Sequence, residues 1–212
     1  DLRHPREALQ GRIRVFCSVT ASYFLLPEVL GRFRHRYPQL ELKLETGDAA
    51  LAVDKVLREE TDIAIAARPD ALPARLQYCL LQRVPLVFIA PRNSTNVSQW
   101  LKDGEPDWSQ VPLIVSQQGL SRKRCDQWFR NKGISPNIYA EVAGNEAIVS
   151  MVTLDCGIGL VPEAVIEHSP LGSQVRVIQP VPALKPFEVG FCVLKRRLDE
   201  PLIQAFWQMV QQ

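Results

Sequence analysis

The chain has 212 residues, 46% of them hydrophobic, with 25 basic and 23 acidic side chains and a formal net charge of +2. This near balance excludes the basic surface that a nucleic-acid-binding protein would carry over the whole chain. No apolar run approaches the ~20 residues of a membrane span. The composition indicates a globular protein of one or two domains, large enough to bury a core without disulfides or metals.

The cysteines and histidines indicate neither disulfides nor a metal site. The cysteines are odd in number and form no Cys-x-x-Cys pair: Cys17, Cys79, Cys125, Cys156 and Cys192. We interpret four of them as small buried apolar residues of a reducing compartment, which favours the cytoplasm. Cys17 is either a fifth such residue, the commoner case, or a reactive thiol. Because the three histidines are far apart in sequence, we expect no metal and no cofactor.

The first third of the chain reads strand, helix, strand, helix, strand. Residues 11–16 alternate between apolar and polar side chains, and helical spacing follows as far as Pro38. Residues 41–46 alternate again and stop at Gly47. The short apolar run over 62–67 is typical of a strand that is buried on both faces of a parallel sheet. This order predicts an α/β unit.

A second unit of the same kind follows a turn-rich break at residues 91–96. Before the break we expect an extended stretch near 76–81 and a strand over 86–90. After it, the expected elements are strands over 111–116, 138–143 and 158–161, helices over 121–131 and 145–154, a loose proline-rich region, a strand over 187–194 and a helix over 199–210. Asp199 is expected to cap the last helix, with Pro201 in its first turn.

Two α/β units joined by two chain crossings, near residues 90 and 185, predict two lobes with a ligand held in a cleft between facing strand ends. Each lobe is expected to be a mostly parallel sheet flanked by helices. The expected divisions are a linker over 1–10, lobe I over 11–90 and 185–212, and lobe II over 91–184.

In lobe I, polar residues stand where the three parallel strands end. The run 18–22 follows the first strand, where unpaired backbone N–H groups and hydroxyls suit a small anion. Capping the next helix is the commoner role of such hydroxyls and is compatible with binding. Gly47 is either a turn residue or, because it has no side chain, a position where a ligand can come close to the backbone. Arg68 is either a solvated cation or a bidentate partner of a carboxylate. The candidate ligand-binding residues are Ser18, Val19, Thr20, Ala21, Ser22, Thr46, Gly47, Ala66 and Arg68.

In lobe II, amide and hydroxyl donors lie between a strand and the helix that begins near residue 121. Three cations in the first turn of that helix oppose its dipole. Arg122 is nearest the loop and is our candidate anion contact, whereas Lys123 and Arg124 are interpreted as a solvated face. Asn145 is expected to cap the next helix first and to contact ligand second. The candidate ligand-binding residues are Gln117, Gln118, Gly119, Arg122, Gly144, Asn145 and Glu146.

Several strings resemble the effector-binding domain of LysR-type transcriptional regulators. They are Leu-Pro at 26–27, Leu-Gly-Arg-Phe at 30–33, Tyr-Pro at 37–38, Glu-Thr-Gly at 45–47, Thr-Asp-Ile-Ala-Ile at 61–65 and Gly-Ile-Gly-Leu-Val-Pro at 157–162. The resemblance covers residues 11–210 and implies a two-lobed periplasmic-binding-protein-like fold of type 2. It also implies a small-molecule coinducer, a homodimer or tetramer, and contact with RNA polymerase. DNA binding would belong to a winged helix-turn-helix that we expect to lie outside this chain.

Further strings, at 16–21, 46–50, 106–109, 144–147 and 198–203, resemble the branch of this family that activates isoleucine and valine biosynthesis. That resemblance implies an acetohydroxy acid coinducer, either acetolactate or acetohydroxybutyrate. Such a molecule presents one carboxylate, one hydroxyl, one ketone and a short alkyl group. Helix ends rich in amides, one arginine and small apolar walls would match these groups.

Two other functions stay open. An extracytoplasmic solute-binding protein would share the expected fold, although the odd number of cysteines is unfavourable to an oxidising compartment. An enzyme is the second alternative, but no Ser-His-Asp set, P-loop or G-x-G-x-x-G motif stands out, and we expect no catalytic residues. The sequence upstream of Asp1 would separate a regulator from a secreted binding protein.

Overall fold

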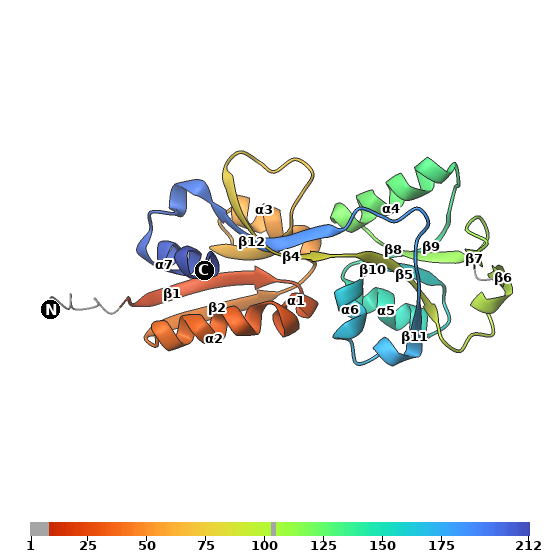
Figure 1. Cartoon of the computed structure of the whole chain (residues 1–212), viewed down its shortest axis with the longest axis horizontal. Helices are drawn as coiled ribbons and strands as arrows, with labels where there is room; N and C mark the ends of the chain where they lie inside the picture. The colour runs from red at the N-terminus through yellow and green to blue at the C-terminus, as the bar shows by residue number, and fades with distance from the viewer. Residues whose placement is uncertain (1–8, 103–104) are drawn as a thin grey trace. The chain divides into compact units, whose positions relative to one another are not determined.

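The structure is a computed structural model that describes residues 9–102 and 105–212, so the linker expected over 1–10 lies almost wholly outside the described residues. The described chain divides into two compact units (Figure 1). Unit 1 comprises the residues up to Gly47, Leu51–Gln82 and Val189–Gln212, and unit 2 comprises Asp48–Ala50 and Arg83–Glu188. No helix in the described ranges has the length and apolarity needed to cross a membrane.

Unit 1 is built on a five-stranded sheet in the order β2-β1-β3-β12-β4. The strands are β1 (Gly11–Cys17), β2 (Leu40–Thr46), β3 (Ile63–Ala67), β4 (Leu76–Val84) and β12 (Phe187–Leu194). β1 is parallel to β2 and β3, whereas β12 is antiparallel to β3. β1 lies between the two strands that follow it in sequence, so its carboxyl end is a topological switch point, the usual place for a ligand in such sheets.

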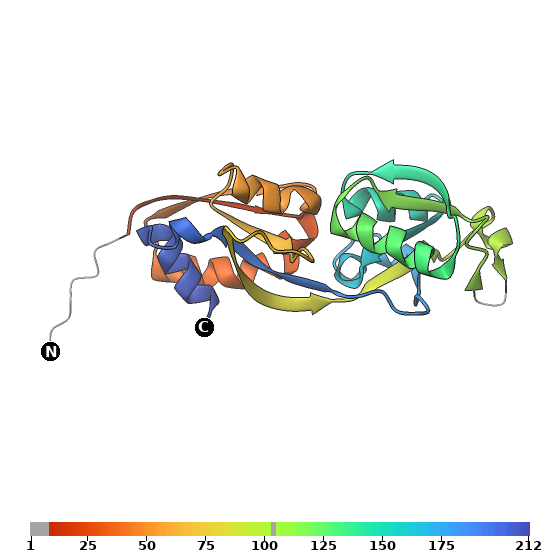
Figure 2. The same cartoon turned by 90° about the horizontal axis from the view of Figure 1, so that it is seen from above.

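Helices cover both faces of this sheet: α1 (Val19–Phe24), α2 (Leu26–Arg36), α3 (Ala52–Leu57) and α7 (Pro201–Val210). Because successive strand residues point to opposite faces, Val15 and Ile65 pack in one cluster with α2 and α7, and Phe16 and Ala64 pack in another with α3. The run over 62–67 is apolar on both faces for this reason, whereas 11–16 alternates and Arg12 and Arg14 stay at least partly exposed. Figures 1 and 2 show β4 beside β12 at one edge of the sheet.

Unit 2 contains a second five-stranded sheet in the order β11-β5-β10-β8-β9. The strands are β5 (Leu86–Pro91), β8 (Pro112–Ser116), β9 (Asn137–Val142), β10 (Ile158–Pro162) and β11 (Val175–Ile178). β8 is parallel to β9 and β10, and β5 is antiparallel to β10 and β11. Figure 1 shows α4 (Gly119–Lys132) on one face, and α5 (Asn145–Thr153) and α6 (Glu163–Glu167) on the other. A small hairpin, β6 (Leu101–Lys102) and β7 (Glu105–Pro106), completes the unit.

Four aromatic side chains form the core between α4 and the second sheet. Phe88 contacts Trp108, Trp128 and Phe129, with ring centroids 4.4, 5.1 and 6.1 Å away. The Nε1 of Trp128 donates a hydrogen bond of 2.7 Å to the carbonyl of Pro182. The Nε1 of Trp108 is buried and has no partner among the described residues.

The α/β architecture and the longer expected elements are confirmed, with four local differences. β5 belongs to the second sheet, because its partners are β10 and β11, although the sequence grouped residues 86–90 with lobe I. The N-cap of α7 is Glu200 and not Asp199, and it makes no side-chain cap. The N-cap of α5 is Gly144 rather than Asn145. β11 and α6 lie in regions where no regular element was expected.

Candidate functional site

The strand register of unit 1 brings the candidate residues of lobe I to one edge of the sheet. Cys17 pairs with Thr46, and Phe16 pairs with Ala64, so β1, β2 and β3 end side by side. We name this place the β1 edge and define it by Ser18–Ser22, Thr46, Gly47, Ala66 and Arg68. The parallel strand order therefore brings these residues together within unit 1.

The hydroxyl groups of the β1 edge are partly used in local structure. Ser18 is the N-cap of α1, and its Oγ accepts a hydrogen bond of 3.1 Å from the backbone N–H of Ala21. Ser22 donates its hydroxyl to the carbonyl of Val19 at 2.5 Å. Thr20 is buried, with 7% of its surface exposed. Capping, the commoner of the two expected roles, is thus present at Ser18.

Close packing and one cation complete the β1 edge. The N–H of Gly47 donates to the carbonyl of Cys17 at 3.1 Å. A Cβ at Gly47 would lie 3.3 Å from the ring of Phe16, so the position favours a residue without a side chain. Arg68 is exposed and forms no ion pair with any residue that the structure describes. The edge therefore offers an exposed cation to a ligand.

Burial decides between the two interpretations of Cys17. It raises the pKa of the Cys17 thiol to about 11, so the thiol is neutral at physiological pH and a poor nucleophile. Cys17 is fully buried among the apolar residues that α2 and α7 cover. The structure therefore favours a buried apolar role.

The register of unit 2 brings together the candidate residues of lobe II in the same manner. Ser116 pairs with Val142, and the N–H of Gln117 donates to the carbonyl of Val142 at 2.9 Å. The loops that leave β8 and β9 therefore start side by side. Both loops contain a glycine with a φ of +89°, at Gly119 and Gly144, a conformation that glycine adopts without strain. We define the β8 edge as Gln117–Gly119, Arg122 and Gly144–Glu146.

Arg122 points back into its own unit. Its Nε donates to Oδ1 of Asp126 at 2.9 Å, and its Nη1 donates to the carbonyl of Ser116 at 3.2 Å. Nη1 also lies 3.2 Å from Oε1 of Glu141. Only 20% of the Arg122 side chain is exposed. The residue expected to contact an anion thus already has two carboxylate partners.

Sequence reasoning missed two residues that shape these edges. Tyr78, on β4, donates its hydroxyl to the carbonyl of Ala66 at 3.1 Å and so holds the end of β3. Glu141, on β9, pairs with Arg122 across the β8 edge. Neither stands in a motif, and only the pairing of strands distant in sequence reveals them.

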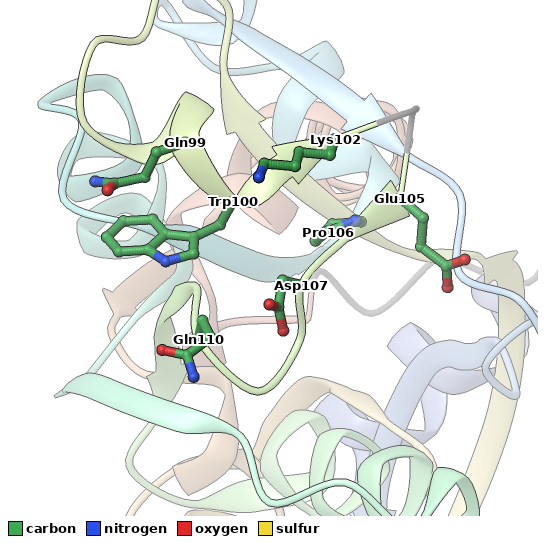
Figure 3. Close-up of a pocket in the computed structure, with 7 residues that line it drawn as sticks. All are labelled: Gln99, Trp100, Lys102, Glu105, Pro106, Asp107 and Gln110. Atoms are coloured by element: carbon green, nitrogen blue, oxygen red, sulfur yellow. The ribbon is translucent and has the colours of Figure 1, made fainter.

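Two pockets lie away from both edges. One, of about 570 Å³, lies beside the β6–β7 hairpin (Figure 3) and is lined by Gln99, Trp100, Lys102, Glu105, Pro106, Asp107 and Gln110. The other, of about 520 Å³, lies between α2 and β2 and is lined by Ile13, Leu30, Gly31, Phe33, Arg34, Tyr37, Pro38, Leu40, Glu41 and Leu42. No candidate residue lines either pocket, so the candidate site is argued from the strand ends. Within residues 9–102 and 105–212, no group of three His, Cys, Asp or Glu residues is placed to hold a metal ion.

Comparison with known proteins gives consistent matches along the chain. The family model described as LysR substrate binding domain matches residues 6–212. The HTH-type transcriptional activator IlvY of Salmonella typhimurium is 45% identical over 217 residues, which cover 99% of this chain and 74% of that protein. The regulator IlvY of Escherichia coli K12 is 46% identical over the same length, covering 99% and 73%. IlvY of Haemophilus influenzae is 43% identical over 212 residues, covering 100% and 73%.

Solved structures share the fold at lower identity. The cofactor-binding domain of the Cbl transcriptional regulator superposes with a TM-score of 0.76 at 22% identity, covering 98% of this chain and 90% of that one. The effector binding domain of QuiR, solved in complex with shikimate, gives a TM-score of 0.77 at 20% identity, covering 95% and 96%. At these identities the likeness concerns the fold alone.

Proposed function

Because the chain belongs to the LysR substrate-binding domain family, the effector-binding part of LysR-type transcriptional regulators, we propose that it senses an acetohydroxy acid. The coinducer would be acetolactate or acetohydroxybutyrate. One observation carries the proposal: the chain is 43–46% identical, over 99–100% of its length, to regulators named IlvY from three genera. The strings shared with the activators of isoleucine and valine biosynthesis favour the same coinducer.

The chemistry of the two edges supports a small hydroxy-keto acid. The β1 edge offers the exposed cation of Arg68 and backbone at a topological switch point, and the buried Ala21 and Ala66 lie in the core beneath it. The side-chain amides of Gln117 and Gln118, exposed at the β8 edge, can donate to hydroxyl and ketone oxygens. That one ligand contacts both edges stays a prediction.

The partners follow from the same proposal. A regulator of this kind would act in the cytoplasm as a homodimer or tetramer, bind DNA through a helix-turn-helix outside this chain and contact RNA polymerase. The two alternatives, a solute-binding protein and an enzyme, receive no support from the relatives, which are named as transcriptional regulators.

Calorimetry tests the coinducer. The purified chain is titrated with acetolactate, and pyruvate serves as the control because it has the carboxylate and ketone but lacks the hydroxyl and the branch. We expect saturable heat with acetolactate and at least tenfold weaker binding of pyruvate, a difference of about 1.4 kcal/mol. No saturable heat, or an equal response to both acids, would remove the assignment.

Two matched arginines test the β1 edge. Arg68→Gln removes the cation at this edge, and we expect it to weaken acetolactate binding by about tenfold. Arg58→Gln, at the end of α3, removes an exposed cation of the same unit and is expected to leave binding unchanged. Thr20→Val, nearly equal in size, should also weaken binding without unfolding the protein. Equal affinities for the wild type, Arg68→Gln and Thr20→Val would place the ligand elsewhere.

A further inference from the structure

Arg122 connects three elements that meet at the β8 edge. Its guanidinium bonds to Asp126 one turn further along α4, to the carbonyl of Ser116 where β8 ends, and to Glu141 on the neighbouring strand β9. The distances are 2.9, 3.2 and 3.2 Å. The side chain is 20% exposed, so these interactions are partly shielded from solvent. Arg122 thus holds the end of β8 against both α4 and β9.

The segment Gln117–Gly119, which connects β8 to the first residue of α4, is named the β8–α4 loop and has no side-chain cap. Gln118 is the N-cap of α4 but provides no side-chain cap, and the first turn contains no acidic residue. Gly119 has a φ of +89° and packs so closely on Ala50 that a Cβ would lie 2.5 Å from the Cβ of that residue. Together with the hydrogen bond from the N–H of Gln117 to the carbonyl of Val142, the guanidinium of Arg122 fixes where the loop begins.

Two carboxylates of the protein already bind the guanidinium of Arg122. The guanidinium is paired with the carboxylates of Asp126 and Glu141, which occupy its Nε and Nη1. A ligand carboxylate would therefore have to compete with these two carboxylates for the guanidinium. The residue type at position 122 indicates an anion contact, but its partners do not.

We propose that Arg122 is a positioning residue that sets effector affinity by holding the β8–α4 loop, without touching the effector. The inference rests on the proposed function, since that loop is where the effector is expected. It assigns the recognition of the effector carboxylate to other groups, with Arg68 of the β1 edge as the available cation.

Replacing Glu141 distinguishes a positioning role of Arg122 from direct contact with the effector, because the two roles predict opposite changes in acetolactate affinity. Glu141→Gln cuts one connection of Arg122 and also deletes a negative charge. If Arg122 positions the loop, acetolactate binds about three- to tenfold more weakly; if it contacts the effector, the freed cation binds acetolactate more tightly.

Arg122→Met should weaken the binding of acetolactate and of its uncharged methyl ester by the same factor, because a positioning arginine makes no bond to the effector carboxylate. A weakening confined to the acid would overturn the proposal.

Hydrogen exchange provides a measurement that needs no ligand. Amide exchange in residues 117–121 should be about tenfold faster in Arg122→Met and Glu141→Gln, with unchanged exchange in unit 1. Lys123→Gln removes the exposed neighbouring cation and is the control, expected to match the wild type in exchange and affinity. Unchanged exchange in Arg122→Met would refute positioning, even if acetolactate binds the wild type as proposed. Conversely, fast exchange without any acetolactate binding would uphold positioning and reject the coinducer.

Discussion

The carboxylate of Asp155 holds the loop that follows β5, and its removal gives a quantitative test of the structure of unit 2. Its oxygens accept hydrogen bonds from the hydroxyl of Ser94 at 2.6 Å and from the backbone N–H groups of Thr95, Asn96 and Val97 at 2.9, 2.7 and 3.1 Å. Asp155 itself has a φ of 60°, a conformation that asparagine also tolerates. Asp155→Asn therefore removes the charge and keeps the backbone conformation.

The loss of stability expected for Asp155→Asn follows from the pKa of Asp155. Desolvation alone would raise this pKa, but the hydrogen bonds from Ser94 and from the backbone outweigh it and lower the pKa from 3.8 to about 2. A change of one in pKa is worth about 1.36 kcal/mol, so the lowered pKa of Asp155 corresponds to roughly 2.5 kcal/mol of stabilisation. Because the side chain is partly exposed, we discount the figure for screening to about 1–2 kcal/mol.

The sign of the pH dependence is fixed by the lowered pKa. Stabilisation by the carboxylate is fully present above the unfolded value of 3.8 and is lost as the pH falls towards 2. We expect Asp155→Asn to lower the free energy of unfolding by about 1–2 kcal/mol at neutral pH and by about half as much at pH ~3. Urea unfolding followed by tryptophan fluorescence reports mainly on unit 2, which holds three of the four tryptophans.

A matched aspartate in the same unit provides the control. Asp107 accepts hydrogen bonds from Ser109, two residues away, and is exposed. Asp107→Asn should change the free energy of unfolding by less than about 0.5 kcal/mol. The reasoning about Asp155 is refuted if Asp155→Asn is as stable as the wild type at neutral pH, or if its deficit is the same at both pH values.

Three further predictions concern the stability of the two units. Trp128→Phe should cost about 1 kcal/mol more than Trp108→Phe in urea unfolding, because Trp128 donates a hydrogen bond that the buried Nε1 of Trp108 does not make within the described part of the chain. Gly190→Ala should lower the melting temperature of unit 1, since its Cβ would clash with a carbonyl of β4, whereas Gly31→Ala, in open space on α2, should raise stability by about 0.5–1 kcal/mol. Arg197→Gln removes a 2.8 Å ion pair to the buried carboxylate that precedes β3 and should cost about 1–3 kcal/mol in the same assay. Equal stabilities within either matched pair, or a neutral Arg197→Gln, would contradict the respective argument.

Elements with a clear periodicity could be predicted from the sequence, because local pattern and burial agree there. β3 is apolar on both faces, since helices cover both sides of the sheet, and this pattern is visible in 62–67. β1 alternates over most of its length and is buried on both faces only at its end, Val15–Cys17. Which sheet a strand joins is a different matter. Residues 86–90 have the composition of a buried strand, yet only their antiparallel pairing with β10 and β11 assigns them to unit 2.

Helix caps show where a local preference yields to the geometry of the chain. Asparagine is a good N-cap, and the sequence favoured Asn145 for this reason. The turn from β9 into α5 requires a φ of +89° at residue 144, which glycine supplies, so Gly144 takes the cap position and Asn145 becomes the first residue of the helix. At the β1 edge no such demand arises, and Ser18 caps α1 as its type suggests.

The role of Arg122 depends on a single extra residue in β9. Leu113 pairs with Ile138, but Ile114 pairs with Ala140, so Tyr139 is skipped in the register with β8. An extra residue shifts every later position of the strand by one and exchanges the faces on which its side chains lie.

Without this bulge, Glu141 would stand opposite Ser116; with it, Val142 takes that place and Glu141 stands opposite Val115. The partner at Asp126 is readable from the sequence, because residues four apart share a helix face. The partner at Glu141 is not, because bulges between parallel strands are rare and leave no periodic signal. A cation in the first turn of a helix, such as Arg122, is therefore assigned to a ligand or to the protein only when the register of the neighbouring strand is known.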